Sequence, residues 1–190
     1  MNYFTTMSAL LKLDFSILTG KLSLKMIQIY CAVNVGMLGF LYGLCAAYFS
    51  ADLLAAGDVP DGSYSAVKII MAGIPVAFLM HAGAALFIWV FLKGMGGKAN
   101  FLTSYFYIGV ASISLWPLAP FGAAFQVLEI QMPPSLFQII TIGAATISLF
   151  YALTLNYLII QKIYQLSQVK MGIATAITII YIGCFLYLWV

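Results

Sequence analysis

The chain holds few side chains that could do chemistry. Its 190 residues include one histidine, three cysteines, five acidic residues and eight basic residues, all of them lysine. Without arginine the chain lacks the planar group that binds phosphates through paired hydrogen bonds. The cysteines stand singly in apolar runs, so we interpret them as small apolar side chains, with a Cys45–Cys184 disulfide as the alternative. A tetrahedral metal site needs about four ligands, so no metal or cofactor is expected.

His81 is the first candidate for a functional side chain. It lies midway between Lys68 and Lys93 in an apolar stretch. Because the pKa of histidine can cross neutrality, His81 could carry a proton or contact a ligand. The alternative is a neutral imidazole that is hydrogen-bonded to a neighbouring helix. A proton path needs a carboxylate, and no acidic residue lies deep in an apolar stretch, which favours the structural role.

Asn34 and Asn156 form a second candidate pair. Each lies a few residues from the lysine-bearing end of its apolar stretch. Their similar depth predicts a hydrogen bond across two helices, worth about 0.6 kcal/mol in a membrane. A polar lining for a cavity is the alternative role.

Enzyme motifs are not found. The segment Gly94–Ala99 contains two consecutive glycines and a lysine but lacks the spacing and the hydroxyl residue of a phosphate-binding loop. One histidine cannot form a His-Glu-x-x-His motif, and no Gly-x-Ser-x-Gly segment occurs. We therefore expect no enzyme.

The elements that position these residues must lie in a membrane. The chain is 64% hydrophobic and 7% charged, with a mean hydropathy of +1.08, whereas a soluble domain has about 25% charged residues. Such a composition excludes soluble enzymes and nucleic-acid-binding domains, and it makes the lipid bilayer the main surroundings of the chain.

Five apolar stretches are long enough to span a bilayer as helices. They predict an all-α integral membrane protein that forms one transmembrane domain over residues 1–190. The expected spans are Met26–Phe49, Ala66–Leu92, Phe101–Leu128, Leu136–Gln161 and Met171–Val190.

The lysines predict the orientation. Seven of the eight lie on one side of these spans, and Lys68 lies on the other with Asp52, Asp58 and Asp61. The positive-inside rule therefore places the N-terminus in the cytoplasm and Val190 on the opposite face.

Residues 1–25 predict an amphipathic helix that lies in the cytoplasmic interface. The alternative is a helix packed on the cytoplasmic face of the bundle. The apolar side chains recur at spacings of three and four along this segment, at Phe4, Met7, Leu11, Phe15, Leu18 and Leu22.

Small residues and prolines predict where helices pack and break. Small residues spaced by four let helix backbones approach closely; the expected packing faces are Gly39, Gly43, Gly73, Ala77 and Ala85. Proline removes a backbone hydrogen bond and kinks or breaks a helix. The expected breaks are at Pro75, Pro117 and Pro120.

Three segments together resemble the Yip1-domain family of five-helix membrane proteins. Gly96–Phe101 resembles the family's glycine pair with a following aromatic residue. Tyr105–Tyr107 and Pro117 resemble its third helix, and Ile163–Lys170 resembles its short basic loop before the last helix. The long cytosolic arm of eukaryotic members is missing, so their GTPase contacts do not carry over. The resemblance implies a compact prokaryotic member without catalytic residues.

These observations predict a non-catalytic membrane scaffold or accessory subunit of a complex, placed in a prokaryotic inner membrane. Its expected partners are the lipid bilayer, other membrane proteins or further copies of itself, and not nucleic acid. The alternative is a small transporter or channel component that uses the proline-broken helices and His81.

Overall fold

The computed structural model describes residues 2–18, 22–55, 65–121 and 135–176. Of these, 87% are helical and none is in a strand, so the all-α prediction is confirmed. Three helices, α2 (Leu24–Ala55), α3 (Ala66–Gly94) and α6 (Leu136–Tyr164), are long and apolar enough to cross a membrane.

Polar caps mark where the helices begin. Ser65 accepts a hydrogen bond from the Lys68 amide at the start of α3, and Asn100 caps α4 (Phe101–Ala111) through the Thr103 amide. At the start of α6, Ser135 and Gln138 form a reciprocal capping box. These bonds satisfy amides that have no partner inside the helix.

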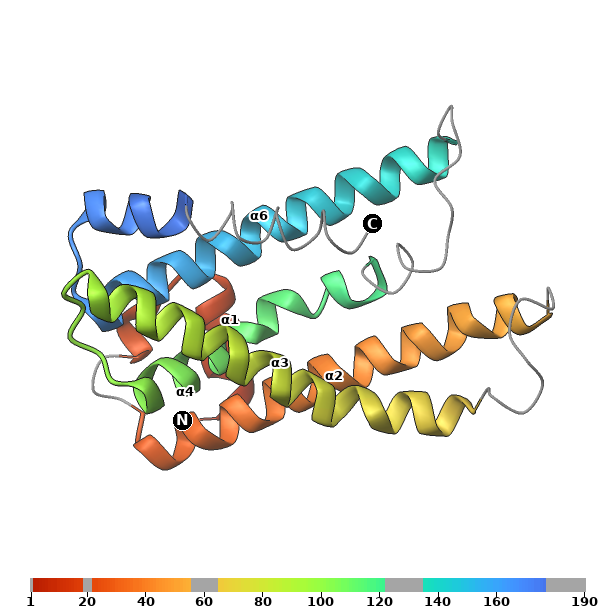
Figure 1. Ribbon diagram of the computed structural model, residues 1–190, viewed down its shortest axis with the longest axis horizontal. Coiled ribbons are helices and arrows are strands. Elements are labelled where there is room, and N and C mark those ends of the chain that lie inside the picture. The colour runs from red at the N-terminus through yellow and green to blue at the C-terminus, as the bar shows by residue number, and fades with distance from the viewer. Residues whose placement is uncertain (1, 19–21, 56–64, 122–134, 177–190) are drawn as a thin grey trace.

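The long helices run roughly along the longest dimension of the molecule (Figure 1). α2 and α3 are antiparallel neighbours, and α4 packs against both and against α6. The short helix α1 (Tyr3–Leu11) lies toward the end where α2 begins and where α3 and α6 end. One apolar core joins α1, α2, α4 and α6, and its fully buried members are Leu10, Val110, Ala111, Leu155 and Ile159.

The third predicted span is not a continuous helix. α4 ends at Ala111 and passes into a 3-10 turn, η2 (Ser112–Leu115), before a turn at Trp116 and Pro117. The chain is helical again at residues 118–121, which include Pro120. The break therefore precedes Pro117, as expected for a residue that disfavours helix in the segment before it.

The predicted break at Pro75 is absent. Pro75 lies inside α3, which continues from Ala66 to Gly94. Proline removes one backbone hydrogen bond, and the residues on either side of it, Gly73 and Ala77, pack closely on α2. This packing keeps α3 helical although one backbone hydrogen bond is missing.

The N-terminal segment differs from the single amphipathic helix that the sequence predicts. α1 ends at Leu11, because Leu13 takes a left-handed conformation with φ 60° and starts a turn that leads to η1 (Phe15–Leu18). The buried face carries Thr6, Met7 and Leu10, whereas Phe4 is 76% exposed. The segment therefore packs against the bundle through this face, and its place in the cytoplasmic interface stays a prediction.

Several predictions fall on residues outside the described part. They are the loop around Asp58 and Asp61, the end of the third predicted span after Phe121, and the end of the fifth predicted span with Cys184. Residues 168–176, which include the start of the fifth predicted span and the three residues before it, are helical.

Candidate functional site

The polar side chains of the bundle gather around the end of α4. Where α4 changes to the 3-10 turn, the Ser112 hydroxyl donates to the Gly109 carbonyl at 2.7 Å, and the Ser114 hydroxyl donates to the Ala111 carbonyl at 2.8 Å. Both serines are buried. A helix end in an apolar interior leaves carbonyls without partners, and these hydroxyls supply donors there.

Asn34 joins three elements at the same break. It is fully buried, and its Nδ2 donates to the Val110 carbonyl at 2.7 Å. Its Oδ1 accepts a hydrogen bond from the Tyr3 hydroxyl, and Trp116 Nε1 donates to the Asn34 carbonyl at 3.0 Å. Burial raises the pKa of Tyr3, with a smaller contribution from Tyr30, so the hydroxyl keeps its proton and remains a donor at neutral pH.

The predicted pairing of Asn34 with Asn156 does not form. Asn156 Nδ2 donates to the Ala152 carbonyl of its own helix at 2.8 Å. This bond spans one turn of α6 and is local, whereas the bonds of Asn34 reach α1 and α4. The two side chains therefore have different roles, although each lies at a similar distance from the lysine-bearing end of its helix.

His81 lies against the middle of α4, at Tyr105, whereas α4 ends at Ala111. Its Nε2 is 2.9 Å from the Tyr105 carbonyl, and the two rings are tilted with centroids 4.6 Å apart. Because a carbonyl only accepts, this bond assigns a proton to Nε2. The Cys31 thiol lies 3.9 Å from the same carbonyl oxygen. His81 is thus held between α3 and α4, as in the structural role weighed above.

Gly109 completes this contact and is the residue that sequence reasoning missed. A Cβ at Gly109 would clash with Cys31 Sγ and would lie 3.0 Å from His81 Nε2. Only glycine lets α2 and α3 bring these two side chains onto α4. The signal in the sequence is a lone glycine in an aromatic-rich helix, which is too common to be informative.

The predicted small-residue face joins α2 to α3. A Cβ at Gly39 would lie 2.5 Å from the Gly73 carbonyl and 2.7 Å from Ala77, and one at Gly43 would lie 2.8 Å from the Ile70 carbonyl. The backbones of the two helices are thus in direct contact. Ala85 is fully buried in a second core cluster, away from this contact.

The two loops at the lysine-bearing end are in contact with each other. Gly96 has φ 91°, a conformation that favours glycine. The Lys98 amide donates to the Tyr164 carbonyl at 3.2 Å, and Lys170 Nζ donates to the Met95 carbonyl at 2.8 Å. The Tyr164 side chain is buried and is hydrogen-bonded to Ser104. Residues 95–100 and 164–170 therefore form one surface.

The hydrogen bonds described above for these groups are with atoms of the bundle itself. In the described ranges, no three His, Cys, Asp or Glu side chains lie close enough to hold a metal ion. Asn34 and the two serines contact backbone carbonyls at the break, and His81 contacts one in the middle of α4. The arrangement supplies hydrogen-bond donors to backbone carbonyls of a broken helix in an apolar interior.

Comparisons with known proteins return no match. No family model, curated protein or solved structure is significantly similar to the chain.

Proposed function

We propose that the chain is a non-catalytic, Yip1-like integral membrane scaffold or an accessory subunit of a membrane complex. One observation carries the proposal: polar side chains of the bundle contact backbone carbonyls of α4, in the middle of the helix and at its end. Asn34 donates to Val110 and His81 lies 2.9 Å from the Tyr105 carbonyl. Side chains used in this way hold a shape, and they are not arranged around a substrate.

The proposed topology has five spans in a prokaryotic inner membrane, with the N-terminus in the cytoplasm. Six described lysines support this orientation: Lys12, Lys25, Lys93, Lys98, Lys162 and Lys170. All six are exposed; five of them lie in or next to the first turn of α2 or the last turns of α3 and α6, and Lys12 follows α1. Lys68 begins α3 at the other end. Positive loops remain on the cytoplasmic side.

The surface made by residues 95–100 and 164–170 is the part that a cytoplasmic partner would meet. Its backbone is fixed by the bonds between the two loops; Lys98 is exposed on it, and Lys93 is exposed beside it in the last turn of α3. A fixed basic surface suits a partner with acidic groups.

Purification from native membranes in a mild detergent tests this function. The proposal predicts that a stoichiometric membrane partner remains with the chain through size exclusion and is identified by mass spectrometry. Recovery of the chain alone, as a monomer or as a closed homo-oligomer, would contradict the accessory-subunit role.

The alternative is a small transporter that uses His81 and the break in α4. The 2.9 Å contact of His81 with the Tyr105 carbonyl of the same helix is the observation in its favour. Proton flux into liposomes distinguishes the two functions. A transporter would show flux that His81→Gln abolishes, since glutamine keeps a donor for the carbonyl but cannot titrate.

A further inference from the structure

Two exposed lysines meet at the loop that follows α3. Lys93 is exposed in the last turn of α3, and Lys170 is exposed in the first turn of the helical residues 168–176. Lys170 Nζ donates to the Met95 carbonyl at 2.8 Å, so the second lysine reaches the chain two residues after the first. The two ammonium groups therefore belong to one basic surface, although they lie far apart in the sequence.

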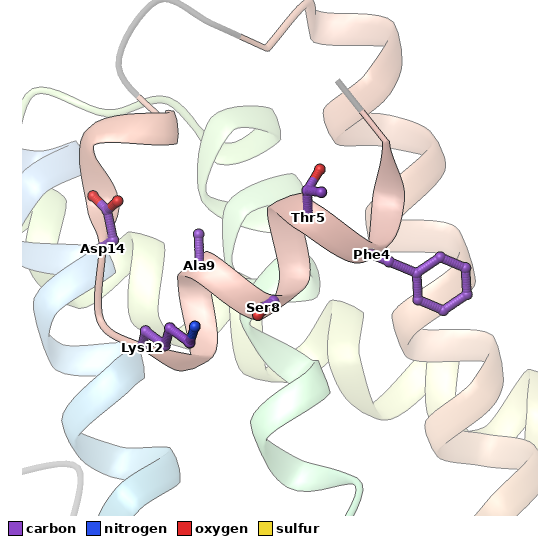
Figure 2. Close-up of a pocket in the computed structure, with 6 residues that line it drawn as sticks. All are labelled: Phe4, Thr5, Ser8, Ala9, Lys12 and Asp14. Atoms are coloured by element: carbon purple, nitrogen blue, oxygen red, sulfur yellow. The ribbon is translucent and has the colours of Figure 1, made fainter.

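No carboxylate lies in the elements that form this surface. Residues 62–128 and 130–190 contain neither Asp nor Glu, and Lys98 adds another exposed cation in the same loop. Lys12 has different surroundings, because it lines an open pocket along α1 that also contains Asp14 (Figure 2). The surface with Lys93 and Lys170 therefore carries net positive charge, which favours a ligand with net negative charge.

The length of α3 indicates the depth of these lysines in a membrane. α3 has 29 residues and is apolar enough to cross a bilayer. A helix of this length measures about 43 Å, whereas the hydrocarbon core is about 30 Å thick. The last turn of an inserted α3, with Lys93, therefore lies among the phospholipid headgroups. The bond of Lys170 to Met95 holds the second ammonium beside this turn.

Exposed apolar side chains lead along the helices to both lysines. On α3, Leu86 and Val90 are 49% and 57% exposed, and they precede Lys93 by seven and three residues. Ile173 is 50% exposed and follows Lys170 by three residues in a helical segment. Residues at these spacings lie on one side of a helix. Each lysine thus ends an apolar surface, as a headgroup ends the acyl chains of a lipid.

We propose that Lys93 and Lys170 bind the phosphate of an anionic phospholipid, such as phosphatidylglycerol, whose acyl chains lie along Val90 and Ile173. A lysine ammonium has three N–H donors; Lys170 uses one for the Met95 carbonyl, and the other two are available to phosphate oxygens. Gly96 leaves the ammonium uncovered, since a Cβ there would lie 3.5 Å from Lys170 Nζ. The inference rests on the proposed membrane insertion and requires no protein partner.

Phosphatidylcholine is the natural comparison, because it has the same phosphate and no net charge. A lysine near an anionic membrane surface strengthens binding about fivefold. The two lysines together should therefore make the chain retain phosphatidylglycerol about tenfold better, or more, than phosphatidylcholine with the same acyl chains.

Native mass spectrometry of the full chain, purified without a partner, tests the site. The chain is taken from vesicles that contain equal amounts of phosphatidylglycerol and phosphatidylcholine, and the retained lipids are counted. Lys93→Gln and Lys170→Gln should each lower the preference for phosphatidylglycerol about fivefold. Glutamine at position 170 keeps a donor for the Met95 carbonyl, so the loop contact can remain. Lys170→Arg keeps the charge and should keep the preference.

Lys12→Gln is the matched control, since Lys12 is also exposed but lies in the pocket with Asp14 (Figure 2). Equal retention of the two lipids by the wild type would overturn the proposal. So would an effect of Lys12→Gln as large as that of Lys170→Gln, or loss of the preference in Lys170→Arg. Binding of inorganic phosphate with no lipid preference would contradict a lipid site. Because no partner is present in this test, the lipid site and the proposed function fail independently.

Discussion

At the residue scale, each backbone carbonyl from Gly109 to Ala111 receives a side-chain donor. Asn34, which is fully buried, donates to the Val110 carbonyl from another long helix. A carbonyl left unpaired in an apolar interior costs a large part of a hydrogen bond's free energy. The polar residues of this chain are therefore expected to matter for stability.

Asn34→Leu should lower the free energy of unfolding by about 1–2 kcal/mol, because it removes the donor to Val110 and the acceptor of Tyr3. Thermal unfolding in detergent measures the change. Asn156→Leu is the control, since its bond stays within one turn of α6. An equal loss in the two variants would show that the cross-helix bonds of Asn34 have no special role.

Gly109→Ala should destabilise the fold by about 1–3 kcal/mol, because the new Cβ would clash with Cys31 Sγ and crowd His81. The same unfolding assay checks this. Gly83→Ala, where no described atom lies within 4 Å of the new Cβ, should be neutral or slightly stabilising. Replacing Cys31 with alanine beside Gly109→Ala should recover part of the loss, and no recovery would contradict the assigned clash.

Among the candidate residues, the sequence could rank His81 and Asn34 as polar groups in an apolar chain but could not name their partners. The predicted partner of Asn34 was Asn156, by depth alone. The actual partners are a backbone carbonyl and Tyr3, and both depend on where α4 stops and where α1 packs. Neither position follows from local residue patterns, because tertiary contacts determine both.

At the element scale, the small-residue spacing of α2 and α3 predicts their contact, since glycine allows backbones to touch. Prolines predict helix breaks less well than small residues predict this contact. Pro75 has no break beside it, whereas α4 ends before Pro117. The difference lies in the neighbouring packing: the turn around Pro75 is held on α2, and the α4 turn has side-chain donors ready to replace its lost bonds.

Gly73→Ala should weaken the contact between α2 and α3, because its Cβ would meet the Gly39 backbone carbonyl, which cannot move aside alone. We expect a loss of about 1–3 kcal/mol, measured as unfolding in detergent. Gly143→Ala is the matched control on α6, with no described atom within 4 Å. If both variants unfold alike, the two helices do not rely on this contact.

The N-terminal helix shows why amphipathic patterns fail over short segments. The apolar stripe from Phe4 to Leu22 assumes one continuous helix, but Leu13 adopts φ 60° and ends it. The apolar residues that follow Leu11 therefore do not continue the apolar face of α1. A conformation of this kind in a leucine has no signal in the residue pattern.

At the scale of the whole molecule, five of the exposed lysines lie at or beside one end of the long helices, and Lys68 lies at the other end. Single-cysteine labelling with a membrane-impermeant maleimide tests the proposed orientation. In a background without native cysteines, Lys68→Cys should react on intact cells, and Lys98→Cys should react only after permeabilisation. The reverse pattern would invert the topology.

The proposed scaffold function requires a partner that binds at the lysine-bearing end of the bundle. The direct measurement is the molar ratio of partner to chain after mild-detergent purification and size exclusion. We predict a fixed integer ratio for the wild type, a lower one for the Lys93→Glu/Lys98→Glu variant, and no change for Lys68→Glu. A chain that elutes without partner, or a partner lost equally in the Lys68→Glu control, would contradict the scaffold function.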